Sequence, residues 1–466
     1  MKSQRVVFKW LAMAFALAVL FAFALVSPSA SAQEGMPPAS TETPTELSPD
    51  KTYFPTMVPT PTPEPEEAPL SFSMQGANEP VPLSTDWSTP LNISGTDSNS
   101  TKPGIAVDSN GGIHVVWTEI DSGGVTEIYY KYRDGTGSWS TLINVSNSNT
   151  FDSNNAQVIA DSNGKAHIVW EEQDDDYAWD AEILYSQCAN GVCTFPVSLS
   201  GPPNWDCGMY LPNLQDWHSE VPVIGLDQAG RLMVEWLAYE PGENTMPYST
   251  WLNSGTPPLV RSGCVPSGAG IYRRAAGISR IMGGLPGDFR LAFEEIRGDG
   301  SQGIYYSHYS NSRWATSFLA TGRLPDLFLD VSSQAHVTWC GSDGKLRYWN
   351  SAILNTETIL NVTCSWHSPI ATDATGLPHV FWEYSGQIYE STRLVEGWSE
   401  RVNISRSSAG AYRPDVVADT NGNLHMVWHD LRDGNSEIYY STTSAYDCSG
   451  TTLSHIGQAV FDVVGG

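Results

Sequence analysis

The sequence is poor in charged residues and especially poor in basic ones. Charged residues make up 16% of its 466 positions, and 24 Lys and Arg stand against 51 Asp and Glu, so the formal net charge is −27. A field of this sign repels phosphate, which argues against nucleic acid and anionic membrane surfaces as partners. The sequence also lacks a Walker loop, a dinucleotide-binding glycine fingerprint, an H-E-x-x-H helix and any C-x-x-C pair. The common nucleotide and zinc signatures are therefore absent.

Aromatic residues and glycine are abundant by contrast. Phe, Trp and Tyr make up 11% of the chain, and it contains 41 Gly. The length suits two or three ordinary domains or one large all-β domain. The aromatic-rich, lysine-poor composition favours the all-β alternative.

The N-terminus has the features of a secretory signal peptide. Lys2, Arg5 and Lys9 precede an apolar run over residues 10–26, and Ala30-Ser31-Ala32 supplies small residues for cleavage. We predict a signal peptide over residues 1–32 and a secreted or cell-surface protein. An uncleaved N-terminal anchor is the alternative, because the apolar run is long for a signal and short for a span.

Residues 33–82 are rich in Pro, Thr and Glu. Such a segment cannot bury a core, so we predict an extended disordered linker. The remaining chain is assigned to a folded domain over residues 83–446 and a tail over residues 447–466. The apolar stretch 459–464 in the tail either covers part of the domain or leads to a further one.

A strand pattern of the type D-S-N-G-G-I-H-V-V-W recurs seven times. A short apolar run precedes each copy, and an aromatic run such as E-I-Y-Y follows most of them. Strand, tight turn, strand, loop and strand make an antiparallel meander. The copies end at Trp117, Trp170, Trp236, Phe293, Trp339, Trp382 and Trp428.

A fourth strand follows some copies, as W-S-T-L-I-N-V-S over residues 139–146 and W-S-E-R-V-N-I-S over residues 398–405. The same pattern stands at residues 87–94, before the first copy, and none follows the last copy. We predict an all-β, seven-bladed β-propeller of four-stranded antiparallel blades, closed by an N-terminal outer strand. An open solenoid is the alternative.

The D-x-N-G-x-x-H-V-V-W blades with I-Y-Y third strands resemble the sialidase-like (BNR-type) propeller repeats of secreted bacterial proteins. Sialidases as a family have six blades, S-x-D-x-G-x-x-W turns, an arginine triad, a Tyr/Glu nucleophile pair and an Asp acid. No turn here matches that pattern, and Lys102-Pro103 stands where the family has its first arginine. Arg413-Pro414 occurs only in the last copy, so the family's catalytic set is not carried over.

Five histidines recur, each three positions before the tryptophan that ends a repeat. Because they occupy equivalent positions in different blades, their side chains cannot bind one metal ion together. We expect them to form hydrogen bonds within or between blades. They are His114, His167, His336, His379 and His425.

Asp108 and Glu119, and likewise Asp161 and Glu172, have the spacing of the first and last ligands of an EF-hand calcium loop. A predicted strand lies between the two residues of each pair, so they would lie at its opposite ends. Asx-turn chemistry explains the aspartates better. We expect no cofactor, and calcium is the weaker alternative.

Seven cysteines follow the signal peptide, so oxidation is expected. We pair Cys188 with Cys193, Cys207 with Cys264, and Cys340 with Cys364. Cys448 is left over.

Loops on one face of the ring carry the candidate site. The candidate catalytic carboxylates, chosen by residue type alone, are Glu119, Glu172, Glu295 and Asp430. The candidate ligand-binding residues are Arg273, Arg274, Arg297, Arg323, Arg413, Arg432, Trp179, Trp205, Trp217 and His218. Arginine forks suit carboxylate or sulfate. Ordinary solvated loops are the alternative.

The predicted function is recognition of an extracellular glycan or cell-surface protein through this face. A glycoside hydrolase of exo-sialidase-like type is the first alternative, and a structural surface protein is the second. We expect a monomer that meets a membrane only through an uncleaved anchor.

Overall fold

A computed structural model describes residues 87–120, 123–148, 151–173, 181–200, 218–239, 246–252, 259–264, 275–297, 299–311, 313–364 and 366–443. The predicted signal peptide, the linker and the tail from residue 447 lie outside these ranges. No helix that is long and apolar enough to cross a membrane occurs within them. All of them belong to the compact unit Pro80–Gly466.

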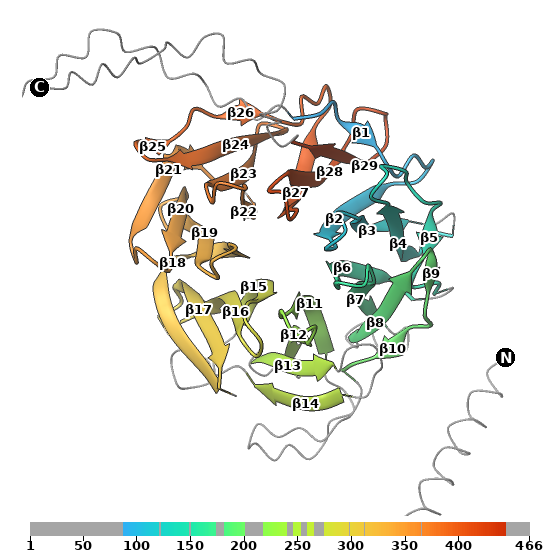
Figure 1. The fold of residues 1–466 in the computed structure, drawn as a ribbon, viewed down its shortest axis with the longest axis horizontal. Coiled ribbons are helices and arrows are strands. Elements are labelled where there is room, and N and C mark those ends of the chain that lie inside the picture. Colours follow the sequence, from blue (N-terminus) through green and yellow to red (C-terminus); the bar gives the residue numbers. More distant parts are fainter. Residues whose placement is uncertain are drawn as a thin grey trace, which may run out of the picture. The chain divides into compact units, whose positions relative to one another are not determined.

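The described chain forms six antiparallel sheets arranged around a ring (Figure 1). The first sheet in sequence contains β2 (Ser100–Val107), β3 (Ile113–Ile120), β4 (Thr126–Arg133) and β5 (Ile143–Asn144). The second contains β6 (Ser153–Ala160), β7 (Ala166–Gln173), β8 (Ala181–Ala189), β9 (Val192–Cys193) and β10 (Val197–Ser198). The third contains β11 (His218–Leu226), β12 (Leu232–Tyr239), β13 (Met246–Leu252) and β14 (Leu259–Cys264).

The fourth sheet has seven strands and the last two have five and four. The seven-stranded sheet contains β15 (Ala275–Gly283), β16 (Phe289–Ile296), β17 (Gln302–Ser310), β18 (Arg313–Leu329), β19 (Ala335–Gly341), β20 (Lys345–Asn350) and β21 (Thr356–Thr363). The next contains β22 (Ile370–Thr372), β23 (Pro378–Tyr384), β24 (Gln387–Leu394), β25 (Gly397–Trp398) and β26 (Val402–Asn403). The last contains β27 (Ala411–Ala418), β28 (Leu424–Asp430), β29 (Glu437–Thr442) and β1 (Leu91–Asn92).

Strand β18 joins two parts of the seven-stranded sheet. Residues 313–321 of β18 pair with β17, and residues 322–329 pair with β19. The all-β antiparallel class is therefore confirmed, whereas the predicted seven blades do not appear as seven separate sheets.

The N-terminal strand completes the last sheet, as predicted. Leu91 pairs with Tyr440 and Asn92 with Tyr439, and an isolated bridge joins Trp87 to Thr443. Residues far apart in the sequence thus hydrogen-bond at one seam, which removes an exposed sheet edge.

The tryptophan at the end of each repeat fills the core. The strands that carry these residues, such as β3, β7 and β19, are buried along nearly their whole length, so both faces of these strands are covered by packing. Six of these tryptophans are less than 2% exposed, and Phe293 is 1% exposed at the equivalent place in β16. The six are Trp117, Trp170, Trp236, Trp339, Trp382 and Trp428.

The Asp turns and the recurrent histidines form one repeated hydrogen-bonded unit. Asp108 Oδ1 accepts the backbone N–H groups of Asn110 (2.7 Å) and Gly112 (2.9 Å). His114 Nε2 lies 3.3 Å from Asp108 Oδ2, and its Nδ1 lies 2.8 Å from the Tyr130 hydroxyl. Both the Asx-turn interpretation and the structural role of the histidines are confirmed.

The unit recurs around His167, His336 and His425, each with an Asp on one nitrogen and a Tyr hydroxyl on the other. At His379 a carboxylate replaces the tyrosine: Nδ1 lies 2.6 Å from Glu390 Oε1, and Nε2 lies 3.3 Å from Asp373 Oδ2. This repeat therefore differs from the others in charge.

Two of the predicted disulfides, Cys188–Cys193 and Cys340–Cys364, are formed. Cys207, needed for the third predicted pair, and Cys448 lie outside the described residues.

Candidate functional site

Bulges in the strands nearest the axis build the candidate site. The register of β2 shifts between Thr101 and Gly104, and that of β27 shifts between Tyr412 and Asp415. Within these bulges Lys102 and Arg413 each adopt a φ of 51°. Asn155, Val221 and Leu324 have similar φ values of 53° to 55° at the equivalent positions.

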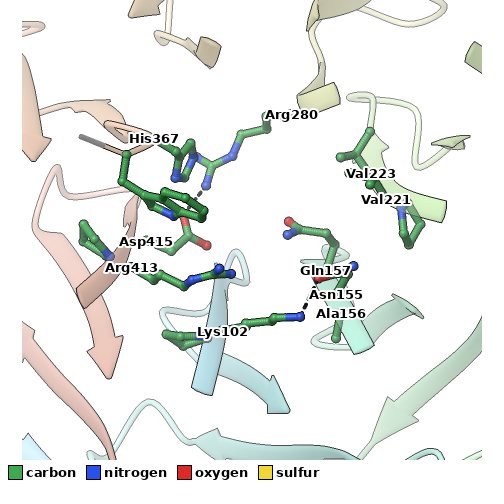
Figure 2. Close-up of a pocket in the computed structure, with 14 residues that line it drawn as sticks. Lys102, Asn155, Ala156, Gln157, Val221, Val223, Arg280, His367, Arg413 and Asp415 are labelled. Atoms are coloured by element: carbon green, nitrogen blue, oxygen red, sulfur yellow. Dashed lines mark hydrogen bonds and ion pairs between the residues drawn. The ribbon is translucent and has the colours of Figure 1, made fainter. Parts of the chain in front are cut away.

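A proline follows four of these five bulge residues. Proline has no N–H to give to the neighbouring strand, and bulges redirect the side chains that they contain. The Lys102 and Arg413 side chains consequently reach toward the axis (Figure 2).

A pocket of about 210 Å³ lies between these bulges. Thr101 pairs with Thr118, and Tyr412 with His429, so the pocket lies at the strand ends that adjoin the loops after the blade tryptophans. This is the face on which the sequence predicts a site. The side chains that define its chemistry are Lys102, Asn155, Gln157, Arg280, Trp366, His367, Arg413 and Asp415.

Arg280 crosses the axis and is neutralised there. It comes from β15 and forms an ion pair with Asp415 of β27, while its Nε lies 3.9 Å from Asp326 Oδ1. Asp415 Oδ2 also accepts the N–H of Ile105 (3.0 Å), and Asp326 Oδ2 accepts that of Ile370 (3.1 Å). This ionic cluster connects four sheets beneath the pocket.

Lys102 and Arg413 differ from Arg280 because no described carboxylate forms an ion pair with either. Lys102 Nζ donates to the neutral acceptors Asn155 Oδ1 (3.1 Å) and Asn154 Oδ1 (3.3 Å). The Arg413 guanidinium lies 4.7 Å from the centre of the Trp366 ring, which is 41% exposed.

Burial lowers the pKa of Lys102, and the nearby Arg413 charge lowers it further, against an opposing effect of Glu171. Burial also lowers the pKa of Arg413, opposed by the attraction of Glu383. The Glu383 side chain accepts the Arg413 backbone N–H, so it holds the bulge rather than pairing with the guanidinium. Two positive charges therefore face one small pocket in a strongly acidic chain.

Three of the four predicted catalytic carboxylates accept a hydrogen bond from the tryptophan that ends their repeat. Glu119 accepts the Trp117 Nε1–H (3.0 Å), Glu172 accepts that of Trp170 (3.4 Å), and Asp430 accepts that of Trp428 (2.9 Å). Burial raises the pKa of Glu172. None of these three lines the pocket, and neither does Glu295, which is 1% exposed on β16.

The four predicted arginines that the structure describes do not lie together in one place. Arg413 lines the pocket. Arg432 binds Asp430 and lies 4.4 Å from the Tyr439 ring, Arg297 lies 4.7 Å from the Phe318 ring, and Arg323 pairs with Cys340 in the β18–β19 register. Two arginines and one lysine line the pocket, and no described lining residue is Tyr or Glu.

Several predicted ligand residues cannot be placed. Arg273, Arg274, Trp179, Trp205 and Trp217 lie outside the described residues. His218 begins β11, and only its backbone is described. No group of three or more His, Cys, Asp or Glu side chains within the described ranges could hold a metal ion.

Sequence reasoning missed Lys102, Asn155, Arg280, Trp366 and Asp415 as site residues. A recurrent X-Pro pair in the strand before several of the repeats was the available signal, as in Lys102-Pro103 and Arg413-Pro414. It marks the bulge and thereby the side chains turned toward the axis.

Comparison with known proteins gives a similarity of fold. No protein-family model and no curated protein matches the sequence. A protein of unknown function from Dyadobacter fermentans is 9% identical, with a TM-score of 0.50 over 76% of this chain and 98% of that one. An α-L-arabinofuranosidase from Fusarium graminearum is 12% identical, with a TM-score of 0.47 over 76% and 97% of the two chains. The NanB sialidase from Streptococcus pneumoniae is 13% identical, with a TM-score of 0.41 over 78% and 71%.

At these identities the similarity concerns the fold alone. The predicted sialidase-like β-propeller fold is confirmed at that level. Activity and ligand are separate questions, because propellers carry many unrelated functions.

Proposed function

We propose that the chain is an extracellular recognition module that binds a single anionic saccharide unit, carrying a carboxylate or a sulfate, in the axial pocket. The observation that carries the proposal is the adjacent pair of cations, Lys102 and Arg413, with no described carboxylate as an ion-pair partner. In a chain with 51 acidic and 24 basic residues, a carboxylate partner is easily supplied, so a site without one favours an external anion.

The pocket's other groups suit a sugar. Trp366, which is 41% exposed, offers a flat apolar surface, and Gln157 offers an amide donor and acceptor in the same pocket. The volume of about 210 Å³ is below the range of roughly 300–1,000 Å³ typical of drug-sized ligands. A terminal unit therefore fits better than an internal stretch of polysaccharide.

We further infer a ring of seven structural units. The two halves of β18 each complete a four-stranded meander, β15–β18 and β18–β21, and the five other sheets supply one unit each. The disulfides favour an oxidising compartment and thus secretion. The predicted signal peptide, linker and monomeric state remain predictions.

The test is calorimetric titration with sialylated, uronic-acid and sulfated oligosaccharides, with neutral lactose as the control ligand. At least one anionic ligand should bind, and Arg413→Gln should weaken binding at least about tenfold, or about 1.4 kcal/mol. Arg401→Gln is the matched control, because its guanidinium lies on the Tyr384 and Tyr389 rings and does not line the pocket. Equal weakening by both variants, or preference for lactose, would contradict the proposal.

Hydrolysis of a glycoside substrate would distinguish the glycoside hydrolase alternative from simple recognition. A retaining mechanism needs two carboxyl groups, or an equivalent nucleophile and acid, beside the scissile bond. Hydrolysis of fluorogenic sialosides by the wild-type chain, abolished by Glu172→Gln or Glu295→Gln, would favour that alternative over simple recognition.

A further inference from the structure

Lys102 is the only described lysine that lines the pocket. Its ammonium donates to two neutral side-chain oxygens and forms no ion pair with a described carboxylate. Arg413, at the equivalent bulge of the neighbouring strand β27, brings a second positive charge to the same pocket (Figure 2). Burial and this charge together lower the pKa of Lys102.

A partly buried amine beside another cation is the arrangement that makes lysine a nucleophile toward carbonyl groups. We propose that Lys102 forms an imine with an α-oxo acid whose carboxylate is bound by Arg413. This inference rests on the proposed function, since both require an anion on Arg413, and it adds a covalent step at the neighbouring amine.

The step balances without an added oxidant or reductant. The neutral Lys102 nitrogen attacks the ligand's carbonyl carbon, a C–N bond forms, and the C=O π electrons move to oxygen. A proton passes from nitrogen to that oxygen through solvent to give a carbinolamine. Protonation by solvent then lets the hydroxyl leave as water, the nitrogen lone pair forms the C=N bond, and the remaining N–H proton returns to solvent.

Lys131 provides a matched control within the chain. Burial lowers its pKa as well, and its Nζ donates to the Ile93 carbonyl oxygen at 2.7 Å. It does not line the pocket, and no neighbouring cation contributes to its pKa shift. Comparing Lys102 with Lys131 therefore separates burial alone from burial beside Arg413.

The experiment treats the full chain with pyruvate and sodium cyanoborohydride at pH 7.5 and maps the reduced adducts by peptide mass spectrometry. We expect Lys102 to be labelled at least about tenfold faster than Lys131, because only Lys102 lies in a pocket with a guanidinium that can bind the carboxylate of pyruvate. Equal labelling of the two lysines would overturn the proposal.

Arg413→Gln tests the role of the guanidinium. It should slow labelling of Lys102 by pyruvate about tenfold, the loss expected for one charged hydrogen-bonding partner. Labelling by the neutral ester methyl pyruvate should slow less than labelling by pyruvate, because the ester loses only the effect of the Arg413 charge on the amine and no carboxylate contact. The remaining ester labelling shows that the variant is folded and the amine accessible. A variant labelled by pyruvate as fast as wild type contradicts the assigned role of Arg413.

Titration of the same preparation with anionic oligosaccharides separates the two proposals. Saccharide binding without selective labelling of Lys102 overturns the imine and leaves the recognition function standing. Selective labelling without saccharide binding supports the imine and overturns the saccharide function. Absence of both overturns both.

Discussion

Trp87 Nε1 donates a hydrogen bond of 2.7 Å to Glu390 Oε2, across 303 residues of sequence. Trp87 belongs to the N-terminal segment that pairs with β29, whereas Glu390 belongs to β24 of the preceding sheet. Its ring also meets Phe381 edge-on at 5.7 Å. The N-terminal segment is thus bound to two sheets, and the seam of the ring depends on a buried carboxylate.

Trp87→Phe should lower the free energy of unfolding by about 1–3 kcal/mol, because it removes a donor from a charged group that is 1% exposed. Trp398→Phe is the control, since Trp398 Nε1 donates to the less buried Glu357 at 3.1 Å. Urea denaturation followed by circular dichroism measures both. A loss for Trp87→Phe no larger than that for the control would show that the seam hydrogen bond contributes little.

The His379 cluster should make the protein less stable at alkaline pH. Asp373 and Glu390 on its two nitrogens raise the pKa of His379 to about 9, against the cost of burial. Because the folded-state pKa is above the unfolded value, the stabilisation is full below about pH 6.5 and is lost as the pH rises through about 9. A neutral imidazole also has only one N–H, so one carboxylate loses its donor.

The expected loss between pH 7 and 9.5 is on the order of 2 kcal/mol, and urea denaturation across this range measures it. His379→Gln cannot titrate and should flatten the profile. Arg393 on β24 binds Glu357, so it does not replace the imidazolium. A wild-type profile that is already flat would contradict the assignment.

Three of the other recurrent histidines should make the protein less stable at acidic pH. Burial lowers the pKa of His114, His167 and His336. Stability from these neutral imidazoles is full above about pH 6.5 and is lost as the pH falls through their lower folded values. We expect the unfolding free energy to fall between pH 6.5 and 4.5, and His167→Gln to reduce this dependence. Because carboxylates also begin to titrate near pH 4.5, the difference between the wild-type and His167→Gln profiles is the decisive measurement.

Much of the fold was predictable because the same structural residues recur in most of the repeats. The Asp turn, the histidine and the terminal tryptophan recur with fixed spacing, and the N-terminal copy of the outer-strand pattern indicated the closure at β29. The division into sheets was less predictable. Strand β18 runs without a break through Thr321 and Gly322 from one part of the seven-stranded sheet to the other, which strand periodicity alone does not indicate.

The candidate pocket lies on the predicted face, and of its lining residues only Arg413 was among the predicted ligand-binding residues. Residue type alone suggested carboxylates such as Glu119, yet their position two residues after a buried tryptophan makes them acceptors for its Nε1–H. Lys102 and Arg413 are single bulge residues, and Arg280 lines the same pocket from another sheet. The recurrent X-Pro pairs mark the bulges in the sequence, but which side chains share the pocket depends on the geometry of the ring.

The two disulfides should differ in their contribution to stability. Cys340 and Cys364 are 24 residues apart, whereas Cys188 and Cys193 are 5 apart. Loop-closure entropy predicts that removing the first costs about 3 kcal/mol and the second about 2 kcal/mol. Paired Cys→Ala variants, compared by chemical denaturation under non-reducing conditions, test this order. A larger cost for the short hairpin would show that local packing outweighs chain entropy.

Removing Arg280 from its ion pair with Asp415 should lower the free energy of unfolding less than removing Asp415 does. Asp415→Ala leaves the largely buried Arg280 with the more distant Asp326 and also removes the acceptor for the Ile105 N–H, so we expect a cost of about 3–5 kcal/mol. Arg280→Met fills similar volume, and Asp415 and Asp326 keep their backbone donors. We expect about 1–3 kcal/mol for this variant. Denaturation measures both costs, and equal values would mean that the arginine is the main connection between the sheets beneath the pocket.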